Sequence, residues 1–76
     1  MTQSLADFAA AQLRAEMARR EISPTELGLR IGVSETWVRR RMRRQRQISL
    51  EDLELIARAL DLPPSFFINQ REAVVA

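Results

Sequence analysis

The feature that most constrains how this chain can fold is a pair of short helical segments within residues 22–46, separated by one glycine-containing turn. The first segment opens with strong helix-start signals. Ser23 is a favourable N-cap, Pro24 suits the first helical position, and Glu26 has the spacing of a capping box. We therefore predict a helix over residues 23–31.

A second helix is predicted almost directly after the first. Gly32 stands where the first helix needs a residue that tolerates positive φ, and Ser34 is a favourable N-cap two residues later. The second helix is expected over residues 34–45. Gly28, inside the first helix, costs roughly 1 kcal/mol relative to alanine, so we expect it to permit a close approach of the second helix.

Three further helical segments are predicted around this pair. Residues 4–21 form the longest amphipathic pattern and begin with Ser4 and Asp7 in a capping spacing. Residues 49–60 begin with Ser49 as the cap and Asp52 as its capping-box partner. The Pro63–Pro64 pair ends that helix and starts a short fifth one over residues 64–69. A chain of 76 residues without internal repeats has room for one small core. We predict an all-α fold, a compact five-helix single domain over residues 1–76.

Basic residues are concentrated in the second helix of the pair. All twelve basic residues are arginine, and six of them fall within residues 39–46 with no acid among them. The other six face ten carboxylates in the rest of the chain, although the formal net charge is only +2. A positive patch on a mildly acidic body is typical of a surface that binds phosphates in one orientation.

A helical wheel divides this arginine-rich helix into two faces. Val38, Met42 and Gln45 gather on the side that we expect to pack against the core. The opposite face carries too much charge to be buried, and it must meet solvent or a polyanion. That face is centred on Thr36, Arg40 and Arg43.

Several side chains on which catalysis depends are missing. The chain has no cysteine, histidine or tyrosine, which excludes disulfides, thiolate or imidazole metal sites, and histidine general-base chemistry. We expect no metal, no cofactor, no small-molecule substrate and no enzymatic activity. The sequence also lacks a signal-like start and a run of 18 apolar residues, so we expect a cytoplasmic protein without a membrane segment.

The spacing of Gly28, Gly32 and Val38 resembles the helix-turn-helix of the lambda-repressor and Cro-like (Xre) DNA-binding family. The resemblance implies that helix 34–45 inserts into the major groove of double-stranded DNA at an operator. It also implies a transcriptional regulator, most like a phage or bacterial repressor or Cro-type protein. The chain departs from the family pattern at Arg44, where glycine commonly ends the recognition helix, and we expect this helix to be longer by part of a turn.

By position, the resemblance implies base contacts from the first turn and the outward face of the recognition helix. Arg40 is the first candidate for a bidentate bond to guanine, worth about 1–3 kcal/mol of discrimination, while Arg39 and Arg43 could read bases or bind phosphate. Glu35 could accept from cytosine or only favour the helix N-terminus. Trp37 could lie against a thymine methyl group or fold over the core edge. The base-contacting candidates are Glu35, Thr36, Trp37, Arg39, Arg40 and Arg43.

Phosphate contacts are expected from two helix N-termini and from the end of the arginine run. The candidates are Thr25, Arg44, Arg46 and Ser49. Farther along, three adjacent large apolar residues on a short helix cannot all face one core, so at least one is either an edge residue of the core or part of a homodimer or partner surface. Its candidates are Phe66, Phe67, Ile68, Val74 and Val75.

Other readings of the arginine run remain open at this point. It could be an RNA-binding segment, a nuclear localisation signal, a membrane-surface helix or a solvated charged face. The helix caps and the glycine turn upstream favour the helix-turn-helix. The second hypothesis is an antitoxin-type interaction protein, whose helix-turn-helix binds an operator while the apolar carboxyl end holds a partner.

Overall fold

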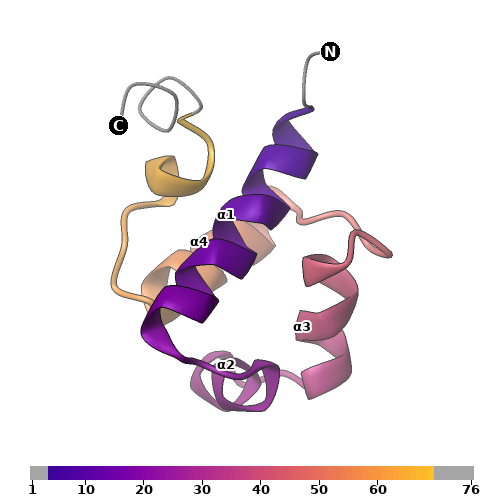
Figure 1. The fold of residues 1–76 in the computed structure, drawn as a ribbon, viewed down its shortest axis with the longest axis vertical. Helices are drawn as coiled ribbons and strands as arrows, with labels where there is room; N and C mark the ends of the chain where they lie inside the picture. The colour runs from indigo at the N-terminus through magenta and orange to yellow at the C-terminus, as the bar shows by residue number, and fades with distance from the viewer. Residues whose placement is uncertain (1–3, 70–76) are drawn as a thin grey trace.

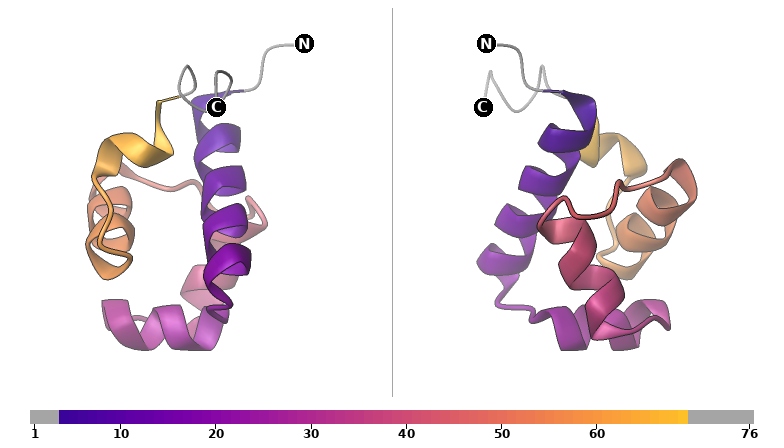
Figure 2. Two further views of the ribbon diagram at one scale, coloured as in Figure 1. Left: turned by 60° about the vertical axis from the view of Figure 1, so that its left-hand side comes forward. Right: turned by 90° about the vertical axis from the view of Figure 1, so that its right-hand side faces the viewer.

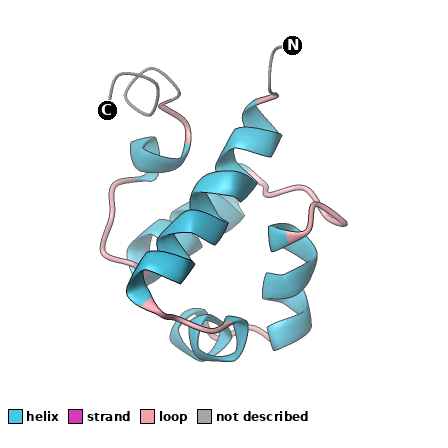
Figure 3. Cartoon of the chain, viewed as in Figure 1, coloured by secondary structure: helices cyan, strands magenta, loops and turns pink. Residues whose placement is uncertain are grey.

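The computed structural model describes residues 4–69, and all regular structure within that range is helical (Figures 1 and 3). The elements in order are α1 (Leu5–Arg20), α2 (Pro24–Ile31), α3 (Glu35–Met42), α4 (Leu50–Ala59) and the 3₁₀ helix η1 (Pro64–Phe67). The all-α prediction is confirmed, but the count of five helices is wrong. Within residues 4–69, four α-helices are followed by a single 3₁₀ turn, because the helix that Pro64 starts continues only to Phe67.

The helices surround one core. In the view of Figure 1, α1 crosses in front of α4, α3 stands beside α1 on the right, and α2 lies across the lower end of the domain, an arrangement that Figure 2 shows from two further sides. Every element contributes at least one side chain that is less than 2% exposed. These core residues are Leu13, Leu27, Val38, Ile56, Leu60 and Phe67. Burial of large apolar side chains from all five elements supplies the main stabilisation of the fold.

Serine caps begin all four α-helices, as the sequence predicts. The hydroxyl of each cap accepts the amide of the residue three positions later, and the four caps are Ser4, Ser23, Ser34 and Ser49. Only the Ser49–Asp52 pair forms a full capping box among the described helices. The box predicted at Ser23 is half formed, because the Glu26 carboxylate binds Arg30 at 2.7 Å instead.

Each α-helix is followed within two residues by a residue with left-handed backbone geometry. These four residues are Glu21, Gly32, Arg44 and Asp61, with φ of 55°, 91°, 63° and 57°. The amide of the next residue then bonds a carbonyl in the last helical turn, as Gln45 does to Arg40 at 2.8 Å. Three of these residues are not glycine, and each of those endings costs roughly 1 kcal/mol.

The arginine-rich helix α3 is therefore shorter than predicted. It ends at Met42 rather than at residue 45, because Arg44 itself takes the left-handed conformation that glycine would adopt. Gln45 lies outside the helix and is exposed, so its predicted place on the packed face is wrong. The departure from the family pattern at Arg44 changes the energetic cost of the helix end and does not lengthen the helix.

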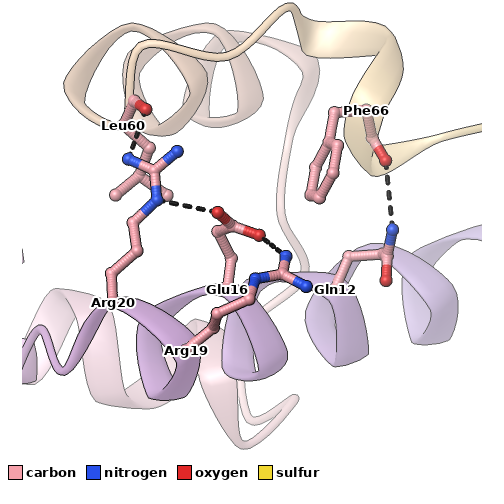
Figure 4. A network of polar contacts seen from close by, with 6 residues as sticks. All are labelled: Gln12, Glu16, Arg19, Arg20, Leu60 and Phe66. Carbon is pink, nitrogen blue, oxygen red and sulfur yellow. Dashed lines mark hydrogen bonds and ion pairs between the residues drawn. The ribbon is translucent and has the colours of Figure 1, made fainter.

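A buried carboxylate of α1 holds the arginine that connects α1 to the end of α4 (Figure 4). Glu16 is only 5% exposed and accepts a 2.7 Å hydrogen bond from Nε of Arg20, as well as an ion pair from Arg19. Nη1 of Arg20 in turn donates to the carbonyl of Leu60 at 2.5 Å. Arg20 therefore closes the last turn of α4 from a neighbouring helix, a contact that no local sequence pattern predicts.

The structure separates the residues of the predicted carboxyl-terminal surface. Phe67 is 1% exposed and belongs to the core, so it is not available to a partner. Phe66 is half-buried and meets Phe67 edge to face at 5.2 Å, whereas Ile68 is 40% exposed. Val74 and Val75 lie outside the described residues.

Candidate nucleic-acid interface

The turn between α2 and α3 depends on the absence of a side chain at Gly28. A Cβ atom there would lie 2.7 Å from the carbonyl oxygen of Val33 and 3.3 Å from the carbonyl carbon of Ser34. The Gly28 carbonyl also accepts the amides of Gly32 and Val33, at 2.7 and 2.9 Å. The predicted close approach is thus present, and its partner is the backbone of the turn rather than a side chain of α3.

Gly32 has a different role in the same turn. Nothing lies within 4 Å of a Cβ atom placed on it, but its φ is +91°. L side chains rarely adopt this conformation, so glycine is needed here for backbone geometry rather than for space. Val33 and Ser34 follow in the turn, and the Ser34 hydroxyl caps α3 by accepting the Trp37 amide at 3.0 Å.

The beginning of α3 is bound to the beginning of α2. The Thr25 hydroxyl donates to Oε1 of Glu35 at 2.6 Å, and Nη2 of Arg39 approaches the same oxygen at 3.3 Å. These contacts, that of Thr25 first and that of Arg39 second, lower the pKa of the Glu35 carboxyl. In this structure an exposed carboxylate therefore holds two side chains that were predicted to contact DNA.

The last turn of α3 is bound to α4 through Arg41. Its Nε donates to Oδ2 of Asp52 at 2.9 Å, its Nη1 donates to the carbonyl of Trp37 at 3.1 Å, and its guanidinium lies 3.7 Å from the centre of the Trp37 ring. The Trp37 ring packs against the core edge, the second of the two orientations considered from the sequence. The sequence pattern does not reveal the role of Arg41, because its partner Asp52 is 11 positions away across a loop.

The Asp52 carboxylate both caps the start of α4 and binds Arg41 of α3. Its Oδ2 accepts both the Arg41 guanidinium and the backbone amide of Ser49, the latter at 3.0 Å. Burial raises the pKa of Asp52, but the Ser49 amide and Arg41 lower it by more, so the pKa lies below its ordinary value. Asp52 is therefore charged at neutral pH and holds Arg41 by charge as well as by geometry.

The end of α3 is bound to α1. Nη1 of Arg14 donates to the carbonyl of Met42, the last residue of α3, at 2.5 Å. Arg44 forms an ion pair with Asp7 in the first turn of α1, and the side chain of Arg44 remains 50% exposed. Positive side chains at a helix carboxyl end are favourable for the helix dipole and for the unpaired carbonyls.

What remains on the outer side of α3 and the following loop is cationic. Arg40, Arg43 and Arg46 are exposed and form no ion pair with any residue between positions 4 and 69. Thr36 is exposed beside them. A shallow hollow of about 250 Å³ runs between α3 and the loop, and it is lined by Ser34, Thr36, Trp37, Arg40, Arg41 and Arg46. The arrangement offers unpaired guanidinium groups to an anionic partner.

The other predicted phosphate contacts lie at exposed positions. Thr25 is exposed at the start of α2, and Ser49 is exposed at the start of α4. Their surroundings differ, because the Thr25 hydroxyl is bonded to Glu35, whereas the Ser49 hydroxyl is used in the cap of α4. No described helix is both long and apolar enough to cross a membrane.

A family model described as a helix-turn-helix domain matches residues 9–65, a span that contains α2, the glycine turn and α3. The match covers most of the chain, and the chain belongs to this family of helix-turn-helix domains. This agrees with the resemblance to the Xre and Cro-like domains, and DNA binding is the activity that such a domain indicates. Neither a curated protein nor a solved structure matches the chain.

Proposed function

We propose that this protein binds double-stranded DNA sequence-specifically, by inserting α3 into the major groove, and regulates transcription as a repressor or Cro-type protein. The observation that carries the proposal is the outer side of α3, where Arg40 in the helix and Arg43 directly after its end are exposed without an ion-pair partner among residues 4–69. An α-helix is about 10–12 Å across, and the major groove is about 12 Å wide. Family membership supports the same activity.

The roles proposed for the side chains follow from their contacts. Arg40 reads guanine through O6 and N7, and Arg43 reads the next base or a phosphate. Glu35 orients Arg39, to which it is already bonded, so that Arg39 reaches the groove in a restricted set of conformations. Thr36 contacts a thymine methyl group or a phosphate. Trp37 packs against the core edge and supports the helix, so that only the exposed edge of its ring contacts DNA.

Phosphates are proposed to bind near both ends of α3. The Thr25 hydroxyl and the first amides of α2 lie near the beginning of α3, to which Thr25 is bonded, whereas Arg46 and the start of α4 at Ser49 follow the end of α3. Arg44 binds a DNA phosphate only while its guanidinium also forms the ion pair with Asp7. These contacts set the orientation of the protein on the duplex and carry no sequence information.

Binding as a two-fold dimer, with half-sites about one helical turn apart, is part of the proposal. The accessible apolar residues of the carboxyl-terminal segment within the described range are Phe66, partly, and Ile68. Light scattering at micromolar concentration tests this assembly. A clean monomer, both with and without DNA, would contradict it.

Selection of bound duplexes from random DNA, followed by sequencing, tests the proposed function. We expect a short enriched motif that contains guanine, and an affinity that falls steeply with salt. The matched control is Arg58→Ala, which removes an exposed arginine of α4 outside α3 and should select the same motif. Equal binding of all duplexes, or tighter binding of RNA of the same length, would contradict the proposal.

A further inference from the structure

Arg41 differs from the arginines that surround it in the sequence. Its side chain is 11% exposed, whereas Arg40 before it and Arg43 after it are exposed. Two of its nitrogens are used within the protein, one by Asp52 and one by the carbonyl of Trp37. One face of its planar guanidinium is covered by the Trp37 ring. Little of this side chain is left to offer to DNA.

We propose that Arg41 is a positioning residue for DNA recognition, which fixes the loop 43–49 and the start of α4 relative to the base-reading face of α3. The inference rests on the proposed function. Arg43 and Arg46 lie in this loop, and Ser49 ends it. The distance between the base-reading arginines and the phosphate-binding ones therefore depends on how the loop is held.

The contacts of the loop show why Arg41 controls it. The loop has no regular structure, and its early part is held by the ion pair between Arg44 and Asp7. Its end is held by Asp52, whose Oδ2 binds both the Ser49 amide and Arg41. Without Arg41, the amides of Gln45 and Arg46 still bond the Arg40 carbonyl and Asp52 still caps α4, but the side-chain connection between α3 and the start of α4 is lost.

The chemistry of arginine is needed for this role. The guanidinium stacks flat on Trp37 while donating at its edge to Asp52, two contacts that a lysine ammonium cannot make together. A phosphate-contacting residue, by contrast, mostly needs its positive charge. Replacement of Arg41 by lysine therefore separates positioning from direct contact.

The test measures binding of Arg41→Lys and Arg41→Met to the duplex selected for the wild type and to a scrambled duplex of the same length. We expect both variants to lose about tenfold in affinity for the selected duplex, the size of effect seen for residues that act through others. Affinity for the scrambled duplex and the salt slope should stay unchanged for Arg41→Lys. The control is Arg58→Met, which removes an exposed arginine outside the proposed site. It should leave the ratio of the affinities for the selected and scrambled duplexes at the wild-type value.

Asp52→Ala gives a second test, because charge alone and positioning predict opposite changes in its affinity for the selected duplex. If only charge mattered, removal of this carboxylate would strengthen binding to every duplex. Positioning through the Arg41–Asp52 pair predicts weaker binding to the selected duplex. It also predicts that the double variant with Arg41→Met is no worse than the worse single variant, since both remove one interaction.

The fluorescence of Trp37, the only tryptophan, provides a readout without DNA. Arg41→Lys and Asp52→Ala should both change its emission, because the guanidinium lies directly over the ring. If Arg41→Met does not fold, Arg41→Lys and Asp52→Ala decide the question. Full rescue by lysine, or a salt slope lower by about 0.9 in Arg41→Met, would overturn the inference and make Arg41 a phosphate contact. A wild type that does not distinguish the two duplexes would overturn the proposed function itself.

Discussion

The Thr25 hydroxyl donates a 2.6 Å hydrogen bond to the Glu35 carboxylate, which binds the first turn of α2 to the first residue of α3. Similar polar contacts hold the last turn of α3, where Asp52 of α4 binds Arg41 and Arg14 of α1 binds the Met42 carbonyl. α3 needs them because it has eight residues and buries only Val38. An isolated helix of this length is unstable in water, so its conformation depends on the three neighbouring helices.

Acid should destabilise the protein through two of these carboxylates. The pKa of Glu35 and that of Asp52 are lowered from ordinary values of 4.5 and 3.8, so the unfolded chain binds more protons than the folded one in this range. Their stabilising contribution is present above those ordinary values and is lost as the pH falls through the lowered ones. We expect the urea concentration at the unfolding midpoint to decrease as the pH is lowered below roughly 4. In Asp52→Asn this decrease should be smaller, because one of the two titrating carboxylates is absent. An identical acid profile in the variant would contradict the assignment.

Gly28→Ala should destabilise the domain by about 1–3 kcal/mol, even though alanine favours helices, because the new methyl group would press on the Val33 carbonyl. Gly32→Ala should cost about 1 kcal/mol for a different reason, since it strains φ without a clash. Urea unfolding measures both. A stabilising Gly28→Ala would mean that the turn can move away at no cost.

Glu21→Gly should stabilise the protein by about 1 kcal/mol, because Glu21 has a φ of 55° at the end of α1, where glycine is unstrained. The control is Glu21→Ala, which removes the same carboxylate from the helix end but keeps the Cβ. The backbone explanation requires the glycine variant to have the higher thermal midpoint. Equal midpoints would attribute the effect to charge.

Glu16→Gln should destabilise the protein by about 2 kcal/mol, since it leaves Arg20 without its charged partner beside the core. Arg19→Gln removes a partner whose side chain is 65% exposed, and it should change the stability by less than about 0.5 kcal/mol. Unfolding in denaturant compares the two. If both variants cost the same, the burial of Glu16 is not what makes its ion pair with Arg20 important.

Arg40→Ala should remove the preference at one or two base pairs while leaving nonspecific binding in place. Arg46→Ala should weaken binding to all sequences alike and lower the salt slope by about one unit. Titrations of the selected and scrambled duplexes at several salt concentrations measure both effects. The same behaviour in the two variants would contradict the division between base-reading and phosphate-binding arginines.

Local signals account for much of what could be predicted here. A serine cap binds an amide in the first turn of its own helix, and the left-handed geometry at Gly32 depends on that residue alone. Because both signals are local, the predicted helix starts and the glycine turn are confirmed. The end of α3 was predicted wrongly because the cost of a left-handed Arg44 is only about 1 kcal/mol, which packing can exceed. Phe67 was assigned to the surface because periodicity cannot say which of three apolar neighbours reaches the core.

The amino-acid sequence by itself determined the helical class, the positions of the four caps, the glycine turn and the concentration of arginines after it, since all of these depend on neighbouring residues. Only the tertiary structure decided which arginines are free. Arg41 is bound to Asp52 and Trp37, and Arg20 to Glu16 and Leu60, whereas Arg40 and Arg43 face outward. The physical reason is that a guanidinium pairs with whichever acceptors the folded chain brings within about 3 Å, and for Arg41 and Arg20 one of these, Asp52 or the Leu60 carbonyl, belongs to another part of the chain.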